Sequence, residues 1–201
     1  MSTITAPLYH ERQAFGRQLC AVHALNALAR APTCSSADFF AVARKLAGGG
    51  AQASRLLGNF DANVLMAAAQ EHAGLELSYF DARRVEKGEA LEELFLSAEE
   101  TSGGGGATTT AGLVLNVPIS GWWGRLRGAR HWLALVPVAA AAAEDAVVWY
   151  NCDSMLAAPE RLGEAREAAA WLRARMGAAP GGATLLVARR LGERGVGEEV
   201  K

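Results

Sequence analysis

The sequence predicts an α+β domain with helices and strands in separate layers. Apolar residues at helical spacing dominate the first half of the chain, and short runs rich in Leu, Val and aromatic residues follow in the second half. This order lacks the regular strand–helix alternation of a parallel α/β sheet. With 201 residues, of which 51% are hydrophobic, the chain is long and apolar enough to bury a core as one domain.

Five helices are expected from apolar spacing and from the residues at their ends. Ser35 or Ser36 can cap the second helix and Asp61 the third, because short polar side chains accept hydrogen bonds from the first free N–H groups of a helix. Gly74 can end the third helix in the left-handed conformation. The expected helices span residues 20–30, 35–46, 61–74, 89–98 and 159–176.

Five short strands are expected at residues 75–80, 112–117, 131–138, 146–152 and 184–188. Two further segments have the composition of loops. Residues 99–112, rich in Gly and Thr, are expected to form a surface loop, and residues 191–201 a flexible polar tail. The chain therefore divides into one domain at 1–190 and a tail at 191–201.

Charge and composition narrow the class of protein. Lys and Arg number 20 against 21 for Asp and Glu, and this balance argues against a nucleic-acid binder. The N-terminal residues lack the pattern of a secretory signal, and the longest apolar run, 132–143, is shorter than the roughly 20 residues of a membrane helix. Three cysteines without CxxC spacing indicate a reducing compartment. We expect a soluble, intracellular protein without membrane insertion.

Cys20 is a candidate nucleophile because it stands where the first helix begins. The free N–H groups and the dipole at a helix N-terminus stabilise a thiolate. The simpler interpretation is that a single cysteine beside Leu19 is a small buried apolar residue.

Two histidines could act as the base for Cys20. His23 lies three residues further along the same helix, where no evident third group would orient its ring, so it is expected to be packed and hydrogen-bonded in the core. His131 begins an apolar strand, which is a rigid mount suited to a general base.

A hairpin could place an orienting group beside His131. If strands 131–138 and 146–153 pair around a loop centred on Ala142, Asp153 lies opposite His131, with Cβ atoms about 5 Å apart. A register centred one residue earlier offers Asn151 instead, and the pattern alone does not choose between them. Alternatively, Asp153 and Ser154 form only a polar turn. The order Cys, His, Asp is that of an activated thiol nucleophile.

Five collinear motifs resemble the Josephin family of ubiquitin-specific cysteine proteases, in particular its small stand-alone members. They cover the chain from about residue 9 to 189 in the order of the family. The motifs are YHERQ (9–13), LCAVHALN (19–26), GNFDANV (58–64), HW (131–132) and WYNCDS (149–154).

The resemblance implies a papain-like fold with an antiparallel sheet, and it implies roles for single residues. Cys20 matches the nucleophile, His131 the general base and Asp153 the orienting residue, which favours Asp153 over Asn151. Gln13 matches the glutamine of the oxyanion hole, where a donor stabilises the tetrahedral intermediate.

His23 and Asn26 match structural positions in the family. The segment between Gln13 and Cys20 is two residues longer than usual in the family, so that Gln18 or a backbone N–H could take part of the role of Gln13. The hairpin after His131 also carries an Ala-rich insertion, which can lengthen a loop without moving its base.

Trp122 and Trp123 are candidate substrate-binding residues in the Gly-flanked loop that precedes His131. Arginines at 125, 127 and 130 follow them, and aromatic residues beside arginines are typical of interface hot spots. The alternative is that one tryptophan fills the core and the arginines are solvated.

The resemblance implies a deubiquitinase that cleaves isopeptide or peptide bonds at the C-terminal glycine of ubiquitin, and we expect the protein to be a monomer. Its expected partners are ubiquitin, polyubiquitin chains and ubiquitinated proteins, and its expected location is the cytoplasm and also the nucleus. No cofactor is expected, and Cys20, His23 and Cys152 lack zinc-site spacing. The alternatives are a catalytically impaired ubiquitin-binding module of the same fold and a different acyl transfer, such as transglutamination.

Overall fold

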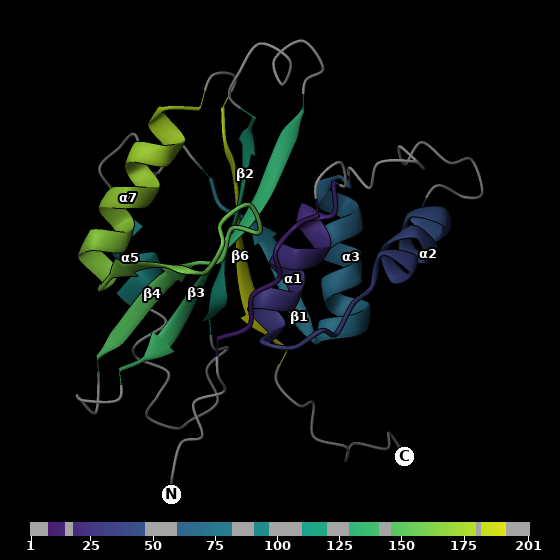
Figure 1. The fold of residues 1–201 in the computed structure, drawn as a ribbon, viewed down its shortest axis with the longest axis horizontal. Coiled ribbons are helices and arrows are strands. Elements are labelled where there is room, and N and C mark those ends of the chain that lie inside the picture. The colour runs from purple at the N-terminus through teal and green to yellow at the C-terminus, as the bar shows by residue number, and fades with distance from the viewer. Residues whose placement is uncertain are drawn as a thin grey trace, which may run out of the picture.

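One antiparallel sheet of six strands forms the centre of the molecule (Figure 1). The computed structural model describes residues 8–14, 18–46, 60–81, 91–96, 110–119, 129–140, 146–179 and 182–191. Within these residues the strand order is β1-β6-β2-β3-β4-β5, and every neighbouring pair is antiparallel. The strands are β1 (Leu75–Tyr79), β2 (Thr110–Pro118), β3 (Arg130–Ala139), β4 (Val147–Asn151), β5 (Glu160–Gly163) and β6 (Thr184–Arg190).

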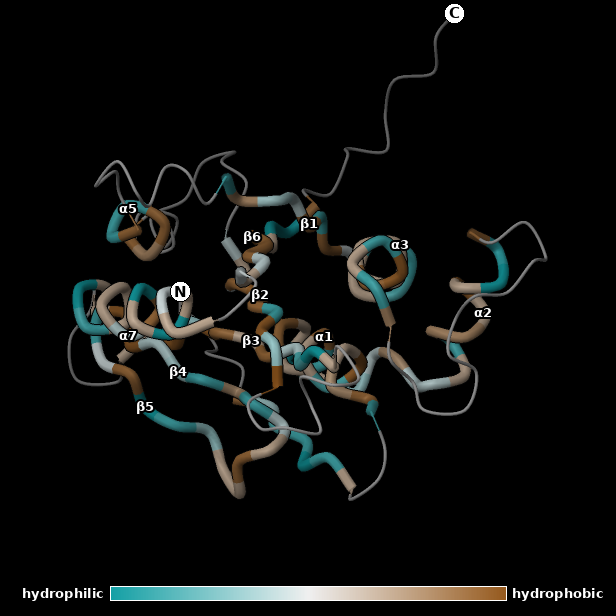
Figure 2. The backbone as a smooth tube through the Cα atoms, turned by 90° about the horizontal axis from the view of Figure 1, so that it is seen from above, coloured by the Kyte–Doolittle hydropathy of each residue, from teal (hydrophilic) through white to brown (hydrophobic). Residues whose placement is uncertain are grey.

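Helices cover both faces of this sheet, as the view from above shows (Figure 2). On one face, α1 packs against β3 and α3 against β1, with α2 outside α3; on the other, α5 and α7 pack together. The helices are α1 (Cys20–Ala29), α2 (Ser36–Leu46), α3 (Ala62–Ala73), α5 (Leu91–Leu96) and α7 (Ala165–Gly177). The predicted α+β fold is confirmed, with helical layers on two sides of the sheet.

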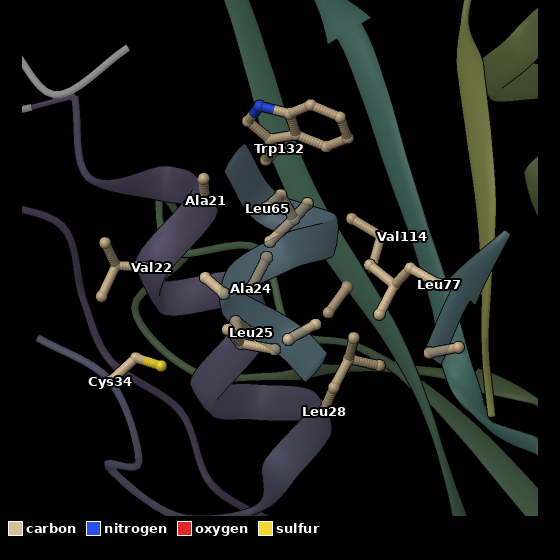
Figure 3. Close-up of a cluster of buried hydrophobic side chains, with 14 of the residues drawn as sticks. Ala21, Val22, Ala24, Leu25, Leu28, Cys34, Leu65, Leu77, Val114 and Trp132 are labelled. Atoms are coloured by element: carbon tan, nitrogen blue, oxygen red, sulfur yellow. The ribbon is translucent and has the colours of Figure 1, made fainter. Parts of the chain in front are cut away.

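The first core lies between α1, α3 and the sheet (Figure 3). Leu25 and Leu28 of α1 meet Leu65 of α3 and Val114 of β2, and all four are fully buried. Trp132 closes this core at one end, where its indole N–H donates to the carbonyl of Phe60 at 2.9 Å. The contact fixes the entry to α3 against β3, close to the strand position of His131.

The second core lies under α5 and α7. Trp149 of β4 is fully buried and meets the ring of Phe95 edge to face, with centroids 4.6 Å apart. Leu133 and Leu135 of β3 point into the same cluster. Because both faces of β3 are buried, its position is fixed from two sides, and this strand carries His131.

Helix ends agree closely with the local signals. Ser35 caps α2, since its hydroxyl accepts from the N–H of Asp38 while the Asp38 carboxylate accepts from the N–H of Ser35. Asp61 accepts from the N–H of Val64 at the start of α3, and Gly74 ends that helix with φ 61°. None of the helices in the described parts of the chain is long and apolar enough to cross a membrane.

One predicted helix was wrong at its start. Residues 160–163 form the edge strand β5, and α7 begins only after Glu164, whose side chain forms a reciprocal capping box with Glu167. Gly163, with φ 105°, turns the chain from strand to helix. The strand forms because the edge of β4 offers free backbone partners to this segment, which no local pattern reveals.

Part of the predicted 99–112 loop is also strand, because β2 begins at Thr110. A bulge interrupts the pairing with β6 between Thr110 and Gly112. At Gly112 φ is 150°, and a Cβ there would lie within 3 Å of Leu135 and Leu28. The remaining strand and helix ends in the described segments fall within two residues of expectation. Residues 99–109 and the tail beyond Leu191 lie outside the described residues.

Candidate active site

Cys20 is the first residue of α1 and is 3% exposed. Leu19 precedes it as the N-cap, and its side chain makes no hydrogen bond to the first N–H groups of the helix. The remainder of α1 is anchored by its buried stripe on β3. The sequence thus mounts one thiol at the positive end of a rigid helix.

His131 lies beside Cys20, near the start of β3, and is also buried. Its Nε2 donates to Oδ1 of Asp153 at 2.6 Å, and the Cys20 side chain is the second group that acts on the pKa of the ring. Burial alone would lower the pKa of His131, but the hydrogen bonds and charges of Asp153 and Cys20 raise it to about 9. The ring therefore favours the imidazolium form, with the carboxylate of Asp153 and the sulfur of Cys20 as the groups that stabilise its charge.

The predicted hairpin register was wrong, although Asp153 does reach His131. Leu135 pairs with Asn151, so Asp153 stands level with Leu133, two residues along β3 from His131. The two registers expected from the sequence placed Asp153 or Asn151 opposite His131, and neither matches this pairing. A long hairpin loop does not fix the register of its strands, so the packing of their two faces determines it. The carboxylate reaches the imidazole diagonally, from the turn that follows β4.

That turn holds Asp153 firmly. Its Oδ1 also accepts from the N–H of Met155 at 2.8 Å, and its carbonyl accepts from the N–H of Leu156. Burial would raise the pKa of Asp153, but the hydrogen bond and charge of His131 hold it below the usual range. Asn151, the alternative from the sequence, instead binds Glu160 and the N–H of Asp153.

The segment that carries Gln13 is attached to the same turn. His10 Nε2 donates to the carbonyl of Asp153 at 3.0 Å, and the N–H of Gln13 donates to the carbonyl of Ser154 at 2.8 Å. The Gln13 side chain makes no hydrogen bond to another described residue, and its Oε1 is buried without a partner. Gln18 lies half-buried, two residues before Cys20.

His23 is hydrogen-bonded as expected, but to a group that the sequence did not suggest. Its Nδ1 lies 2.5 Å from the carboxylate of Glu11, which also accepts from Tyr9 and Asn26. The expectation that no third group orients His23 was wrong. Glu11 and His10 belong to the short polar motif at residues 9–13, ahead of Cys20. A carboxylate in this motif was the sequence feature that could have predicted a partner for His23.

Asn26 connects this network to the chain after α1. It is 1% exposed, and its amide exchanges two hydrogen bonds of 2.9 Å with the backbone of Cys34. Because Asn26 also donates to Glu11, one buried side chain joins the Gln13 segment, α1 and the start of α2. This agrees with the structural role that the resemblance implies.

The other two cysteines have different surroundings. All three thiols are free and buried, but burial raises the pKa of Cys34 to about 11 and that of Cys152 to about 12. Neither is hydrogen-bonded to an imidazole in the described residues. Cys20 is therefore the thiol placed for acid–base chemistry.

A pocket of about 320 Å³ is lined by Arg130 and Trp132, which flank His131 on β3. Cys20, His131 and Asp153 themselves are not part of its lining, because successive side chains of a strand point to opposite faces. The Arg130 guanidinium donates hydrogen bonds to the side chain and the carbonyl of Asn116 on β2. It also donates to the carbonyl of Gly182 at 2.9 Å. The rest of the lining consists of residues 60–62 at the entry to α3 and of Tyr79, Asn116 and Thr184. Trp122 and Trp123 lie outside the described residues.

A six-stranded antiparallel sheet, a cysteine at the head of a packed helix and a histidine–aspartate pair beside it define the papain-like α+β class. The chain belongs to the Josephin family, whose model matches residues 16–178. Josephin-2 of Homo sapiens is 33% identical over 199 residues, covering 94% of this chain and 90% of that protein. Josephin-2 of Mus musculus is 34% identical over 168 residues, covering 78% and 73%. The resemblance seen in the motifs is thereby confirmed.

Proposed function

We propose that this protein is a deubiquitinase that hydrolyses the bond after the C-terminal glycine of ubiquitin. Membership of the Josephin family supports a function of the deubiquitinase type. The observation that carries the proposal is the buried row Cys20–His131–Asp153, in which a carboxylate 2.6 Å from the imidazole orients it toward a thiol.

In the proposed reaction the Cys20 thiolate attacks the glycine carbonyl and His131 remains protonated beside it. His131 then gives its proton to the leaving lysine amine, and the acyl group stays on sulfur as a thioester. Neutral His131 next removes a proton from water, whose oxygen attacks the thioester and releases the ubiquitin carboxylate and the thiol. Asp153 keeps Nε2 protonated, which leaves Nδ1 facing the thiol throughout.

Gln13 is proposed as a donor to the oxyanion of the tetrahedral intermediate. It is bound through its own backbone to the turn that follows Asp153, while its side-chain amide makes no hydrogen bond to another described residue. A preorganised donor of this kind can contribute about 10²–10³ in rate. The N–H groups at the head of α1, which the side chain of Leu19 does not cap, are a second source of donors.

Substrate would contact the molecule around His131. The pocket beside Arg130 and Trp132 is one proposed surface, and the loop with Trp122 and Trp123 is another. A bulky Thr184→Trp variant, which fills the pocket, is expected to raise KM for a ubiquitin substrate. An unchanged KM in folded protein would remove the pocket from the proposal.

A ubiquitin-binding module without turnover is the second candidate function. The longer spacing between Gln13 and Cys20 favours it, because displacement of Gln13 would weaken the oxyanion hole. Binding of ubiquitin chains by the wild type without hydrolysis would select this candidate.

The test is reaction with ubiquitin that carries a thiol-reactive group at its C-terminus. We expect one adduct with the wild type, none with Cys20→Ala and slower formation with His131→Ala. The matched controls are Cys34→Ala and Cys152→Ala, which should react like the wild type. Failure of the folded wild type to form an adduct would contradict a thiol-dependent deubiquitinase.

A further inference from the structure

Ser154 and Gln13 are neighbours in the fold, and each has a buried side-chain oxygen without a hydrogen-bond partner among the described residues. The N–H of Gln13 donates to the carbonyl of Ser154 at 2.8 Å, which fixes the two backbones together. Ser154 is 2% exposed, and its hydroxyl has no hydrogen-bond partner among the described residues. The Oε1 of Gln13 is likewise buried and unpartnered. A hydroxyl can donate, and an amide oxygen can only accept.

A purely structural role does not account for this serine. Buried polar atoms are nearly always hydrogen-bonded, because leaving one unsatisfied destabilises the fold. The hydroxyl of Ser154 is unsatisfied, so alanine would serve the fold equally well or better. It stands directly after Asp153, which binds His131. Two unsatisfied atoms at this place point to a hydrogen bond made during the reaction.

We propose that Ser154 is a positioning residue that acts through Gln13. When substrate enters, the Ser154 hydroxyl donates to Oε1 of Gln13, which directs the amide Nε2–H toward the developing oxyanion. No proton is transferred in this step. The inference rests on the proposed function, because it assigns a role within the same acyl-transfer reaction.

This arrangement also explains how the longer approach to Cys20 can be tolerated. The N–H of Gln13 is attached to the turn at 153–154, and the residues before it are attached to α1 through Glu11. Neither attachment depends on the residues between Gln13 and Cys20. Extra residues between Gln13 and Cys20 can then lengthen the connection without moving the amide, since loop length affects closure only weakly.

The experiment measures hydrolysis of a fluorogenic C-terminal amide of ubiquitin by the full chain. We expect Ser154→Ala to lower kcat about tenfold or more with KM unchanged, since small misplacements in a site are costly. Gln13→Ala should lower kcat by a factor on the order of 10²–10³, because it removes the proposed oxyanion donor. The double variant should be no slower than Gln13→Ala, because Ser154 acts only through that residue. Ser78→Ala, a serine on β1 remote from this turn, is the matched control and should leave kcat unchanged.

Alkylation of Cys20 by iodoacetamide supplies the second readout. This displacement forms no oxyanion, so Ser154→Ala should react at the wild-type rate and melt no lower than the wild type. Wild-type kcat in Ser154→Ala, additive losses in the double variant, slowed alkylation or a lowered Tm would each overturn the inference. Absence of turnover by the wild type would instead overturn the proposed function, and the inference with it.

Discussion

The carboxylate of Glu11 lies 2.5 Å from Nδ1 of His23, joining the segment that carries Gln13 to the helix that carries Cys20. His10 and Gln13 bind the turn of Asp153 and Ser154 on the other side. The polar segment 8–14 thus bridges the two parts of the candidate site. Glu11 binds α1, whereas His10 and Gln13 bind the turn that follows β4, so the segment acts as a clamp between α1 and that turn.

Loss of the Glu11 carboxylate should loosen this clamp. Glu11→Ala removes the acceptor shared by Tyr9, His23 and Asn26, and we expect it to destabilise the protein by about 1–3 kcal/mol. Urea denaturation measures the difference. Glu93→Ala, on the short helix α5, is a control with little expected effect. Equal stability of the two variants would contradict the clamp.

The contribution of Glu11 should also depend on pH. Burial acts to raise the pKa of Glu11, but the hydrogen bonds of Tyr9, His23 and Asn26 lower it from 4.5. A carboxylate with a lowered pKa in the folded state contributes stability above its unfolded pKa and loses it as pH falls. The stability gap between the wild type and Glu11→Gln should therefore shrink below pH 4.5. A constant gap in urea titrations at several pH values would contradict this.

The alkaline limit of activity should follow His131. The imidazolium is needed as the proton donor, and it is lost as pH rises through about 9, so kcat/KM should decline there. Asp153→Asn removes the charge that raises this pKa, and burial then acts to lower it. The alkaline limb should move to lower pH in this variant, with a large loss of kcat. Glu160→Gln, on the neighbouring strand β5, is the control and should leave the alkaline limb at the wild-type pH. If the alkaline limb of Asp153→Asn also stays at the wild-type pH, Asp153 does not raise the pKa of His131.

Gly112 should resist substitution far more than Gly74. A Cβ at Gly112 would collide with the carbonyl of Leu135 and lie 2.6 Å from Leu28, at a φ of 150°. We expect Gly112→Ala to cost about 2–4 kcal/mol, combining strain and overpacking. Gly74→Ala meets nothing within 4 Å and should cost only about 1 kcal/mol for its left-handed φ. Similar Tm values for the two variants would contradict the close approach of β2 to α1.

The expected role of Trp122 and Trp123 in binding the substrate can be tested by mutation. Replacement of both Trp122 and Trp123 by Ala should raise KM for a ubiquitin substrate, because aromatic anchors carry much of the energy of protein interfaces. The rate of iodoacetamide alkylation at Cys20 serves as the control and should stay unchanged. A wild-type KM in folded protein would remove this loop from the substrate surface.

Local chemistry determined most of the elements. Capping by Asp61, the left-handed end at Gly74 and the apolar spacing of α1 depend on residues a few positions apart, so the sequence alone specifies them. Cys20 at the head of α1 and His131 at the head of β3 follow from the same patterns. The five motifs added the choice of Asp153, because their order along the chain is that of a family.

Tertiary structure decided what depends on pairing between distant segments. The register that sets Leu135 against Asn151, the edge strand β5 and the Glu11–His23 contact all form between residues whose separation leaves many alternatives. A long hairpin loop does not fix a register, and a free edge accepts any strand of suitable length. The sequence by itself therefore determined which residues carry the candidate chemistry. Only packing of both faces of β3 decided that Asp153 meets His131 from a turn and not from across a strand.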